Sequence, residues 1–454
     1  MSSLLEKAKA WNLNQLQADT KPLDISAFVA RGHVEMAGQQ LVDGGSFDFL
    51  GLASDIRVRE AAASALKRLG LQPVAGLRLQ AELEQRMAAF WGTEDAFYSA
   101  LPSPVFHSLL ALAKTAWTTE AEAWPFLSFP PSQQGTFLEF LESPLPSPLP
   151  SLVLVCGISP FRGHLPPLPQ LLQKVQAFKG SLCVDESLSL GLLGNNGKGT
   201  DAHFHLPAQA TWKLCDLGQT LGAQGFVFAG PRPVVSYLRN HPLGRQHSWG
   251  QAPNLAAALR ALQLLEAEPW RKERLWEIAQ HLHLALRKLG FDLGPSVTPL
   301  LPLWVGEESK VETLREALRK SGLWLRERLA GKNSHFIFCP KATYSDEELQ
   351  RSLEVLASVA HRHQWHVQAS PKTAEQNFYL ANAHPSVWAN PAKPHWTPRS
   401  PLPQTYISVR KATLRELYQQ AGTSEFMEEL LWQLLSLHKP SLRQKAADWL
   451  LKRL

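Results

Sequence analysis

The chain has 454 residues, of which 44% are hydrophobic and 19% are charged. This length predicts two or three packed units, and the composition is that of a globular protein. A formal net charge of +6 is small for the length and does not indicate nucleic-acid binding. The sequence has no run of about 18 uncharged apolar residues and no apolar signal core near its start, so we expect a cytoplasmic protein with no transmembrane segment.

Neither the cysteines nor the histidines are spaced as metal ligands. The four cysteines are far apart and form no C-x-x-C pair, which indicates buried reduced thiols; they are Cys156, Cys183, Cys215 and Cys339. The histidine groups have no carboxylate or cysteine at ligand spacing; they are His203 with His205, His281 with His283, and His361, His363 and His366. We therefore predict no metal site.

From residue 47 onward, helix-like and strand-like segments alternate. Before that point the chain has a helical stretch and a turn at 43–45. Helical spacing of apolar residues predicts helices, and short apolar runs predict buried strands; the helices are at 57–69, 81–91 and 168–178, and the strands at 152–156, 181–184 and 226–228. The alternation predicts a doubly wound α/β sheet with Asp185 at the carboxyl end of a strand, where such sheets bind ligands.

The second half of the chain changes character twice. Long helical stretches at 255–289 lead to a strand-helix-strand-helix pattern at 290–362, which predicts a small α+β unit. A stretch rich in proline follows, and helical patterning then returns. We divide the chain into an N-terminal segment (1–45), a large domain (46–265), a small domain (266–365), a Pro-rich linker (366–405) and a helical tail (406–454).

The most specific stretch spans 184–200 and reads V-D-E-S-L-S-L-G-L-L-G-N-N-G-K-G-T. It resembles the V-D-E-A-H-S-x-G-x-x-G-x-x-G-R-G signature of the α-oxoamine synthases, which are pyridoxal-phosphate (PLP) enzymes. Further similarities lie at 49–52, 76–84, 163–169 and 345–349, so that the resemblance covers 45–360. It implies a fold-type I PLP-dependent transferase with a mostly parallel sheet, a small α+β C-terminal domain and a helical tail.

The resemblance also implies roles for individual residues. Asp185 corresponds to the aspartate that pairs with the pyridine nitrogen of PLP, and Ser187 and Leu188 follow it in the cofactor site. Ser248 is the serine of the family's F-S-T motif, which reaches the cofactor phosphate of a partner subunit. The Schiff-base lysine of T-L-S-K-A-L-G falls on Gln219, and an amide cannot form an imine. The resemblance thus implies PLP and vestigial binding positions, with no catalytic residue.

Other positions depart from the family in the same region. The family's histidine contact to the cofactor is Leu188, and the glycine of its phosphate loop is replaced in 99–102, where the sequence is S-A-L-P. The segment 117–134 has no counterpart of the ring-stacking histidine. The carboxylate-binding arginine falls on Ile337. These combined losses indicate a site released from catalysis.

We therefore interpret the chain as a non-catalytic, structural or regulatory member of a PLP acyltransferase dimer. The S-L-S at 187–189 resembles the lysine-less subunit of serine palmitoyltransferase. That resemblance implies a homodimer, or a heterodimer with a lysine-bearing homologue whose pocket this chain helps to complete.

Two alternatives remain open. The chain could be an active PLP-dependent acyl-CoA:amino acid C-acyltransferase that uses another lysine, Lys213 or Lys198. It could also be a scaffold that acts through residues 366–454, whose basic side chains would allow docking to a partner or weak contact with an anionic membrane surface. Acidic residues interleave with those bases, which favours a solvated helical face.

Overall fold

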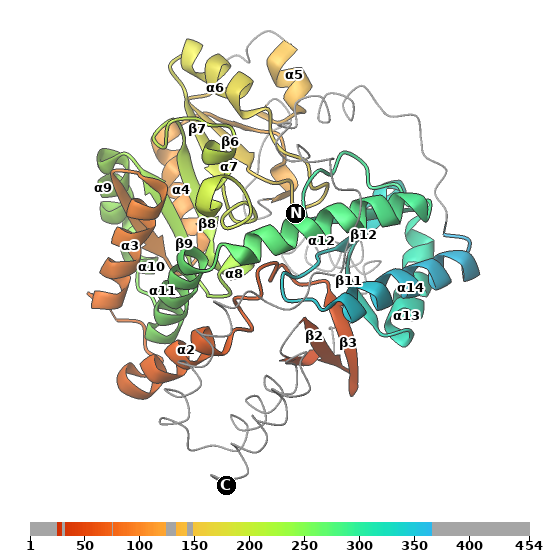
Figure 1. The fold of residues 1–454 in the computed structure, drawn as a ribbon. Coiled ribbons are helices and arrows are strands. Elements are labelled where there is room, and N and C mark those ends of the chain that lie inside the picture. The colour runs from red at the N-terminus through yellow and green to blue at the C-terminus, as the bar shows by residue number, and fades with distance from the viewer. Residues whose placement is uncertain (1–24, 30–31, 75, 124–132, 143–148, 366–454) are drawn as a thin grey trace, which may run out of the picture. The chain divides into compact units, whose positions relative to one another are not determined.

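The computed structural model describes residues 25–29, 32–74, 76–123, 133–142 and 149–365. They form two six-stranded sheets joined by a long helix (Figure 1). The predicted linker and tail, 366–454, lie outside the described residues. No helix in the described part of the chain is long and apolar enough to cross a membrane.

The first sheet has the strand order β4-β9-β8-β7-β6-β5. Its strands are β4 (Asp95–Ser99), β5 (Ala116–Thr118), β6 (Leu152–Cys156), β7 (Ser181–Asp185), β8 (Trp212–Asp216) and β9 (Phe226–Gly230). Strands β5 to β8 run parallel, whereas β9 pairs antiparallel with both β8 and β4. The carboxyl ends of β5 to β8 therefore meet at one edge, as the alternating sequence pattern predicted.

Helices cover both faces of this sheet because its strands are apolar on both sides. On β6, Val153 and Val155 belong to a core cluster that includes Leu171 of α6. Leu154 belongs to another cluster, with Phe106 of α4. The helices are α2 (Ile56–Leu69), α3 (Arg78–Trp91), α4 (Pro102–Ala113), α5 (Phe137–Glu142), α6 (Leu168–Ala177), α7 (Thr200–His203), α8 (Leu217–Thr220), α9 (Arg232–Asn240), α10 (Pro242–His247) and α11 (Ala252–Ala267).

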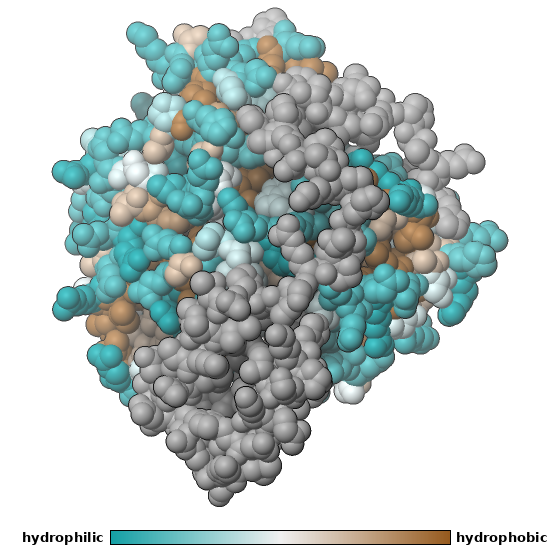
Figure 2. Space-filling model, viewed as in Figure 1, coloured by the Kyte–Doolittle hydropathy of each residue, from teal (hydrophilic) through white to brown (hydrophobic). Residues whose placement is uncertain are grey.

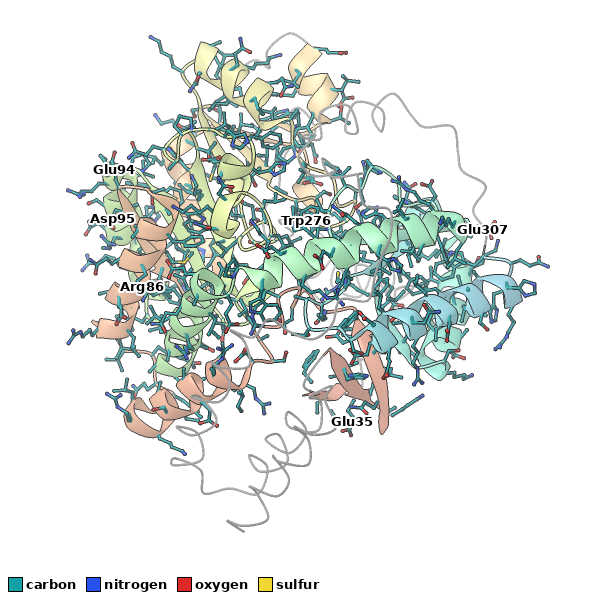
Figure 3. All side chains as sticks on the ribbon, viewed as in Figure 1. Glu35, Arg86, Glu94, Asp95, Trp276 and Glu307 are labelled. Carbon is teal, nitrogen blue, oxygen red and sulfur yellow. The ribbon has the colours of Figure 1, made fainter. Side chains whose placement is uncertain are left out.

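Helix α12 (Trp270–Lys288) leads into the second sheet, whose order is β1-β2-β3-β11-β12-β10. Near the start of α12, Trp276 (labelled in Figure 3) donates from Nε1 to Leu192 O at 2.8 Å and so ties the helix to the first domain. The elements of the second unit are β1 (Ile25–Val29), β2 (His33–Met36), β3 (Gln39–Gly44), β10 (Leu301–Gly306), α13 (Glu308–Lys320), β11 (Leu323–Arg328), β12 (Ser334–Phe338) and α14 (Asp346–Arg362).

The three N-terminal strands are the main difference from the sequence expectation. Ala37 and Gly38 both have positive φ, 51° and 74°, and form the tight turn of a β2–β3 hairpin. Strand β3 then pairs in parallel with β11, with Val42 opposite Leu323. Residues that the sequence analysis set apart as an N-terminal segment therefore form part of the small-domain sheet.

A buried charge network fixes the start of α2 against the junction of α11 and α12. Arg271 donates to Asp55 Oδ2 at 2.6 Å and to Glu268 Oε2 at 2.8 Å, while Arg57 binds the same two carboxylates. Burial alone would raise the pKa of Asp55, but hydrogen bonds from Arg57 and the charge of Arg271 outweigh it and lower that pKa to about 2. The network is structural and joins segments more than 200 positions apart.

Hydrophilic side chains predominate on the face of the molecule seen in Figure 2. An exposed apolar group lies at the end of α2 and just after it, formed by Leu66, Leu69, Leu71 and Val74. Several large apolar side chains exposed within nine residues of the chain are a candidate for a protein interface.

Candidate functional site

Asp185, at the carboxyl end of β7, is bound to its own motif. Its Oδ1 accepts hydrogen bonds from the backbone N of Ser187, at 2.9 Å, and from Ser187 Oγ. The same hydroxyl accepts from the backbone N of Asp216 at 2.7 Å. Ser187 therefore links the ends of β7 and β8, and this link fixes Asp185 relative to the strand that leads to Gln219.

Glu186 anchors the glycine-rich loop, a role that the sequence analysis did not identify. Its fully buried carboxylate accepts from Thr200 N at 3.0 Å, from Thr200 Oγ1 at 2.8 Å and from Ser189 Oγ. A Cβ on Gly199, which has φ +95°, would lie 2.5 Å from Glu186 Oε2. Burial and the nearby charge of Asp201 raise the pKa of Glu186 to about 7. Packing of the glycine-rich loop therefore requires both Glu186 and Gly199.

A pocket of about 890 Å³ lies beside the carboxyl end of β8. Its lining includes Ala100, Leu101, Asp216, Gln219, Arg326 and Lys341. Of the positions predicted for the site, Gln219 lines this pocket, whereas Asp185, Ser187, Leu188 and Ser248 do not. Leu188 instead belongs to the hydrophobic core.

Gln219 lies on the short helix α8, which begins directly after β8. Asp216 caps this helix by accepting from Gly218 N at 2.8 Å. Gln219 Nε2 lies 3.5 Å from Asp216 Oδ2, at the limit of hydrogen-bond distance. Burial raises the pKa of Asp216. The pocket wall at this point is therefore an amide beside a carboxylate.

The two lysines considered from the sequence do not line the pocket. Lys213, on β8, is buried, and its Nζ donates to Asp201 Oδ2 at 2.8 Å and to Ala208 O at 2.7 Å. Lys198 lies in the glycine-rich loop, half-buried and outside the lining. The lysine that does line the pocket among the described residues is Lys341, which the sequence analysis did not single out.

Lys341 lies just after β12 and is almost fully buried. Its Nζ donates to Ser46 O at 2.6 Å and to Cys339 O at 3.3 Å, and lies 3.6 Å from Asp43 Oδ2. Three oxygens therefore surround the Lys341 Nζ and hold it in place. Lys341 thus joins the turn after β3 to the end of β12.

Arg326 is a second cation that the sequence analysis missed. It is the cross-strand neighbour of Ile337, the position where the resemblance places a carboxylate-binding arginine. The Arg326 guanidinium lies 4.3 Å from the centre of the Phe47 ring, and its Nε donates to Gly45 O at 3.0 Å. The pocket therefore has an arginine on β11, directly across from Ile337 of β12, whose side chain carries no charge.

Near the predicted phosphate loop, the hydrogen-bond donors have partners within the protein. Ala100 N donates to His247 O at 2.8 Å, and Ser99 Oγ donates to the same oxygen at 3.2 Å. Ser248 ends α10 immediately after that carbonyl. A phosphate group needs several free N–H or O–H donors at close approach, and these two are already used.

A buried acidic cluster lies at the ends of β5 and β6. Glu120 follows β5 and receives hydrogen bonds from Ser159 and Cys156. Burial raises the pKa of Glu120 and, with the charges of Glu120 and Asp185, that of Cys156. Burial also lowers the pKa of nearby His164 to about 3, which keeps its ring neutral. The cluster thus holds its thiol and imidazole in their uncharged forms.

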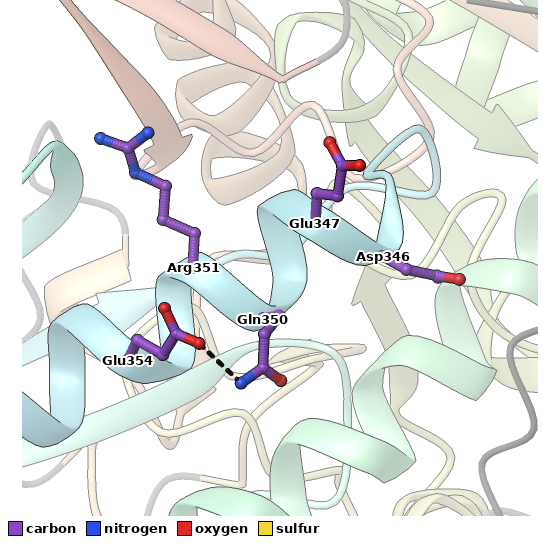
Figure 4. A pocket seen from close by; sticks show the side chains of 5 residues that line it. All are labelled: Asp346, Glu347, Gln350, Arg351 and Glu354. Carbon is purple, nitrogen blue, oxygen red and sulfur yellow. Dashed lines mark hydrogen bonds between the residues drawn. The ribbon is translucent and has the colours of Figure 1, made fainter.

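A shallow polar depression on α14 has no link to these groups. It is lined by Asp346, Glu347, Gln350, Arg351 and Glu354, and Figure 4 shows Gln350 bonded to Glu354, at 2.9 Å. These are successive side chains of one helix face. All four cysteines are buried and free, and the described residues contain no group of three or more His, Cys, Asp or Glu arranged to hold a metal.

Solved structures share this architecture. Serine palmitoyltransferase of Sphingomonas wittichii superposes with a TM-score of 0.69 at 18% identity, covering 80% of this chain and 99% of that one. A structure of SPT with a PLP internal aldimine gives the same TM-score and coverage at 18% identity. The 8-amino-7-oxononanoate synthase of Francisella tularensis has a TM-score of 0.60 at 16% identity, covering 71% and 99%. The fold is therefore that of a fold-type I PLP-dependent transferase.

Comparison of the sequence with known proteins shows which members of this class the chain resembles. Residues 140–356 match the family Aminotransferase class I and II. The chain is 28% identical over 352 residues to 8-amino-7-oxononanoate synthase 1 of Bacillus velezensis, covering 72% of this chain and 90% of that protein. It is 26% identical over 356 residues to serine palmitoyltransferase of Sphingobacterium spiritivorum, covering 72% and 88%. Residues 140–356 therefore carry an aminotransferase class I and II domain, and the relatives that the chain resembles include 8-amino-7-oxononanoate synthases and serine palmitoyltransferases.

Proposed function

We propose that this chain is a non-catalytic α-oxoamine synthase homologue that serves as a structural or regulatory subunit of a PLP acyltransferase dimer. The observation that carries the proposal is the position of Gln219, which follows β8 and lines the pocket where the family motif has its Schiff-base lysine. Bound PLP supplies an electron sink for amino-acid substrates. Entry into that chemistry requires an amine, which an amide side chain does not offer.

The described residues of the pocket do not fit PLP held in the family's manner. Gln219 has no amine, and the donors at Ser99 and Ala100 are bonded to His247 O. Leu188 is packed in the core and offers no polar contact. Asp185 remains, but Ser187 already binds its Oδ1. We therefore derive no catalytic step for this chain alone.

An active enzyme would have to use Lys341, the lysine in the described lining of the pocket. Its contacts with Ser46 O, Cys339 O and Asp43 oppose this use, because they hold the Nζ that would have to attack the aldehyde of PLP. The test is to add one equivalent of PLP to the purified chain and to the Lys341→Arg variant. A wild-type imine absorbance that is lost in Lys341→Arg would establish the active alternative.

The partner follows from the same proposal. We infer a homodimer or a heterodimer with a lysine-bearing homologue, and the exposed apolar group from Leu66 to Val74 supports an interface. The test is affinity purification of the tagged chain from its native cells, followed by mass spectrometry and measurement of mass in solution. Recovery of a lysine-bearing homologue in equal amount supports the heterodimer. A homodimer that contains no PLP supports a structural role without a catalytic partner. A homodimer that turns over an acyl-CoA and an amino acid contradicts the proposal.

A further inference from the structure

The Arg326 guanidinium is held in the wall of the pocket by two contacts. It lies 4.3 Å from the centre of the Phe47 ring, and its Nε donates to Gly45 O at 3.0 Å. The ring covers one face of the planar group, and the backbone bond fixes one edge. In the part of the chain that the structure describes, the terminal nitrogens Nη1 and Nη2 have no hydrogen-bond acceptor and no carboxylate within 4.0 Å.

Two terminal donors on one edge of a guanidinium match the two oxygens of a carboxylate or a phosphate. We propose that Arg326 binds the carboxylate or phosphate of a small amphipathic anion in this pocket, with Nη1 and Nη2 each donating to one oxygen. The proposal deepens the proposed function, on which it rests only in making this anion a regulatory ligand of a non-catalytic subunit.

Two of the other cations in the lining already have acidic partners. Lys341 Nζ lies 3.6 Å from Asp43 Oδ2, and His33 Nδ1 lies 3.1 Å from Glu348 Oε1. Arg59, on α2, is exposed and has no carboxylate within 4.0 Å among the described residues. Arg59 is therefore a second unpaired cation of the lining, and its charge also favours an anion in the pocket.

The remaining carboxylates of the lining are bound by their own loops. Asp48 Oδ1 accepts from Ala53 N at 3.0 Å, and Asp216 Oδ1 accepts from Gly218 N at 2.8 Å. Burial raises the pKa of both acids, which disfavours their negative charge. Neither carboxylate lies within 4.0 Å of Arg326. These acids therefore leave the terminal nitrogens of Arg326 to a ligand.

The face of β11 that carries Arg326 continues into apolar side chains. Trp324 lies two residues earlier, so both side chains point to the same face of the strand. The Trp324 ring lies 6.5 Å from that of Phe28, which is 54% exposed and lines the pocket. Leu101, 43% exposed, also belongs to the lining. A hydrocarbon part of the ligand would remove such surface from water, which is favourable. The wall therefore favours an amphipathic anion over a bare inorganic one.

The experiment measures dissociation constants by calorimetry on the full chain at neutral pH. The probes are octanoate, octyl phosphate, octanamide and inorganic phosphate: octanamide is the uncharged counterpart of octanoate, and inorganic phosphate lacks the hydrocarbon part. Arg326→Gln removes the charge, whereas Arg326→Lys keeps it without the paired donors. Arg232→Gln is the matched control, because Arg232 is an exposed arginine at the start of α9, outside the pocket lining.

We expect octanoate, octyl phosphate or both to bind the wild type, and the tighter of the two identifies the preferred oxyanion. Arg326→Gln should weaken this binding by about tenfold or more, as expected for the loss of charge-assisted hydrogen bonds. Arg326→Lys should recover part of the loss, and Arg232→Gln should change the affinity by less than about twofold, because its charge is screened from the pocket.

Four results would overturn the proposal. They are no binding of either amphipathic anion, unchanged affinity in Arg326→Gln, octanamide binding as tightly as octanoate, and inorganic phosphate binding as tightly as octyl phosphate.

A failure of this proposal is distinct from a failure of the proposed function. Calorimetry with these probes involves neither PLP nor turnover, so a lack of binding leaves the non-catalytic assignment intact. Turnover of an acyl-CoA and an amino acid by the chain alone would contradict the proposed function, whatever the affinity for octanoate.

Discussion

Lys213 Nζ lies 2.8 Å from Asp201 Oδ2 in the interior of the large domain, and both side chains are almost fully buried. Both oxygens of Asp201 also lie 2.9 Å from Thr211 Oγ1. The ion pair with Asp201 gives Lys213 a structural role. Lys213 is also the lysine nearest along the chain to Gln219, six residues away, and this ion pair makes it unavailable for a Schiff base.

We predict that Lys213→Met lowers the free energy of unfolding by about 3–5 kcal/mol, because it leaves the Asp201 carboxylate buried without its partner. The double variant Lys213→Met with Asp201→Leu should lose less than Lys213→Met alone, since no unpaired charge remains. Urea titration followed by circular dichroism measures both. Unchanged stability in Lys213→Met would contradict the account of this pair.

A second prediction concerns Gly199, whose added Cβ would approach Glu186 Oε2 to 2.5 Å. Gly199→Ala should destabilise the protein through both the clash and its φ of +95°. Gly306→Ala is the control, because Gly306 has φ +88° but no atom within 4 Å of the added Cβ. Strain alone predicts a loss of about 1–3 kcal/mol for Gly306→Ala. Thermal unfolding should show a clearly larger loss for Gly199→Ala, and equal losses would argue against the clash.

The raised pKa of Glu186, about 7 in the folded chain against an ordinary 4.5, predicts a pH dependence of stability. Between these values the folded state retains a proton that the unfolded state releases, so the contribution of Glu186 to stability falls as pH rises from about 4.5 to 7. The shift corresponds to about 3 kcal/mol. The difference in unfolding free energy between pH 5 and pH 8 should be smaller in Glu186→Gln than in wild type. Parallel pH profiles for the two proteins would show that Glu186 does not titrate in this range.

The exposed apolar group on α2 and after it predicts an effect on assembly. Leu69→Glu combined with Leu71→Glu should reduce the mass of the particle measured by light scattering, because charge at an apolar interface is costly to bury. Leu284→Glu is the control, since Leu284 is exposed singly on α12. The thermal midpoint of the isolated subunit should stay the same in both. An unchanged oligomeric mass in the double variant would place the interface elsewhere.

The parts of this fold that local patterns determine were predictable from the sequence. The fully buried run of β6 and the amphipathic pattern of α2, closed by Gly70, gave elements within a residue or two of those observed. The place of β3 in the small-domain sheet was not expected, because β3 pairs with β11 about 280 positions away. No local pattern contains such a pairing.

Some residues of the candidate site were likewise predictable from the sequence, and others were not. Gln219 could be found because it falls within a motif, and Asp185 and Glu186 because they belong to the signature. The role of Glu186 as an anchor for Thr200 depends on a loop that closes through space, so the motif alone did not reveal it. Lys341 and Arg326 reach the pocket from the second sheet, and nothing in the sequence around Lys341 marks it. A weak signal was available for Arg326, which is charged in a strand that starts with three buried residues.

The central claim is that the wild-type chain forms no imine in this pocket because position 219 carries an amide. The direct measurement is incubation with one equivalent of pyridoxal, reduction with borohydride, and peptide mass spectrometry on the wild type, Gln219→Lys and Gln224→Lys. Gln224 also lines the pocket and controls for an amine placed there in another position. We predict stoichiometric labelling at position 219 in Gln219→Lys, with none in the pocket of the wild type and less in Gln224→Lys. Stoichiometric labelling of a pocket lysine in the wild type would contradict the claim.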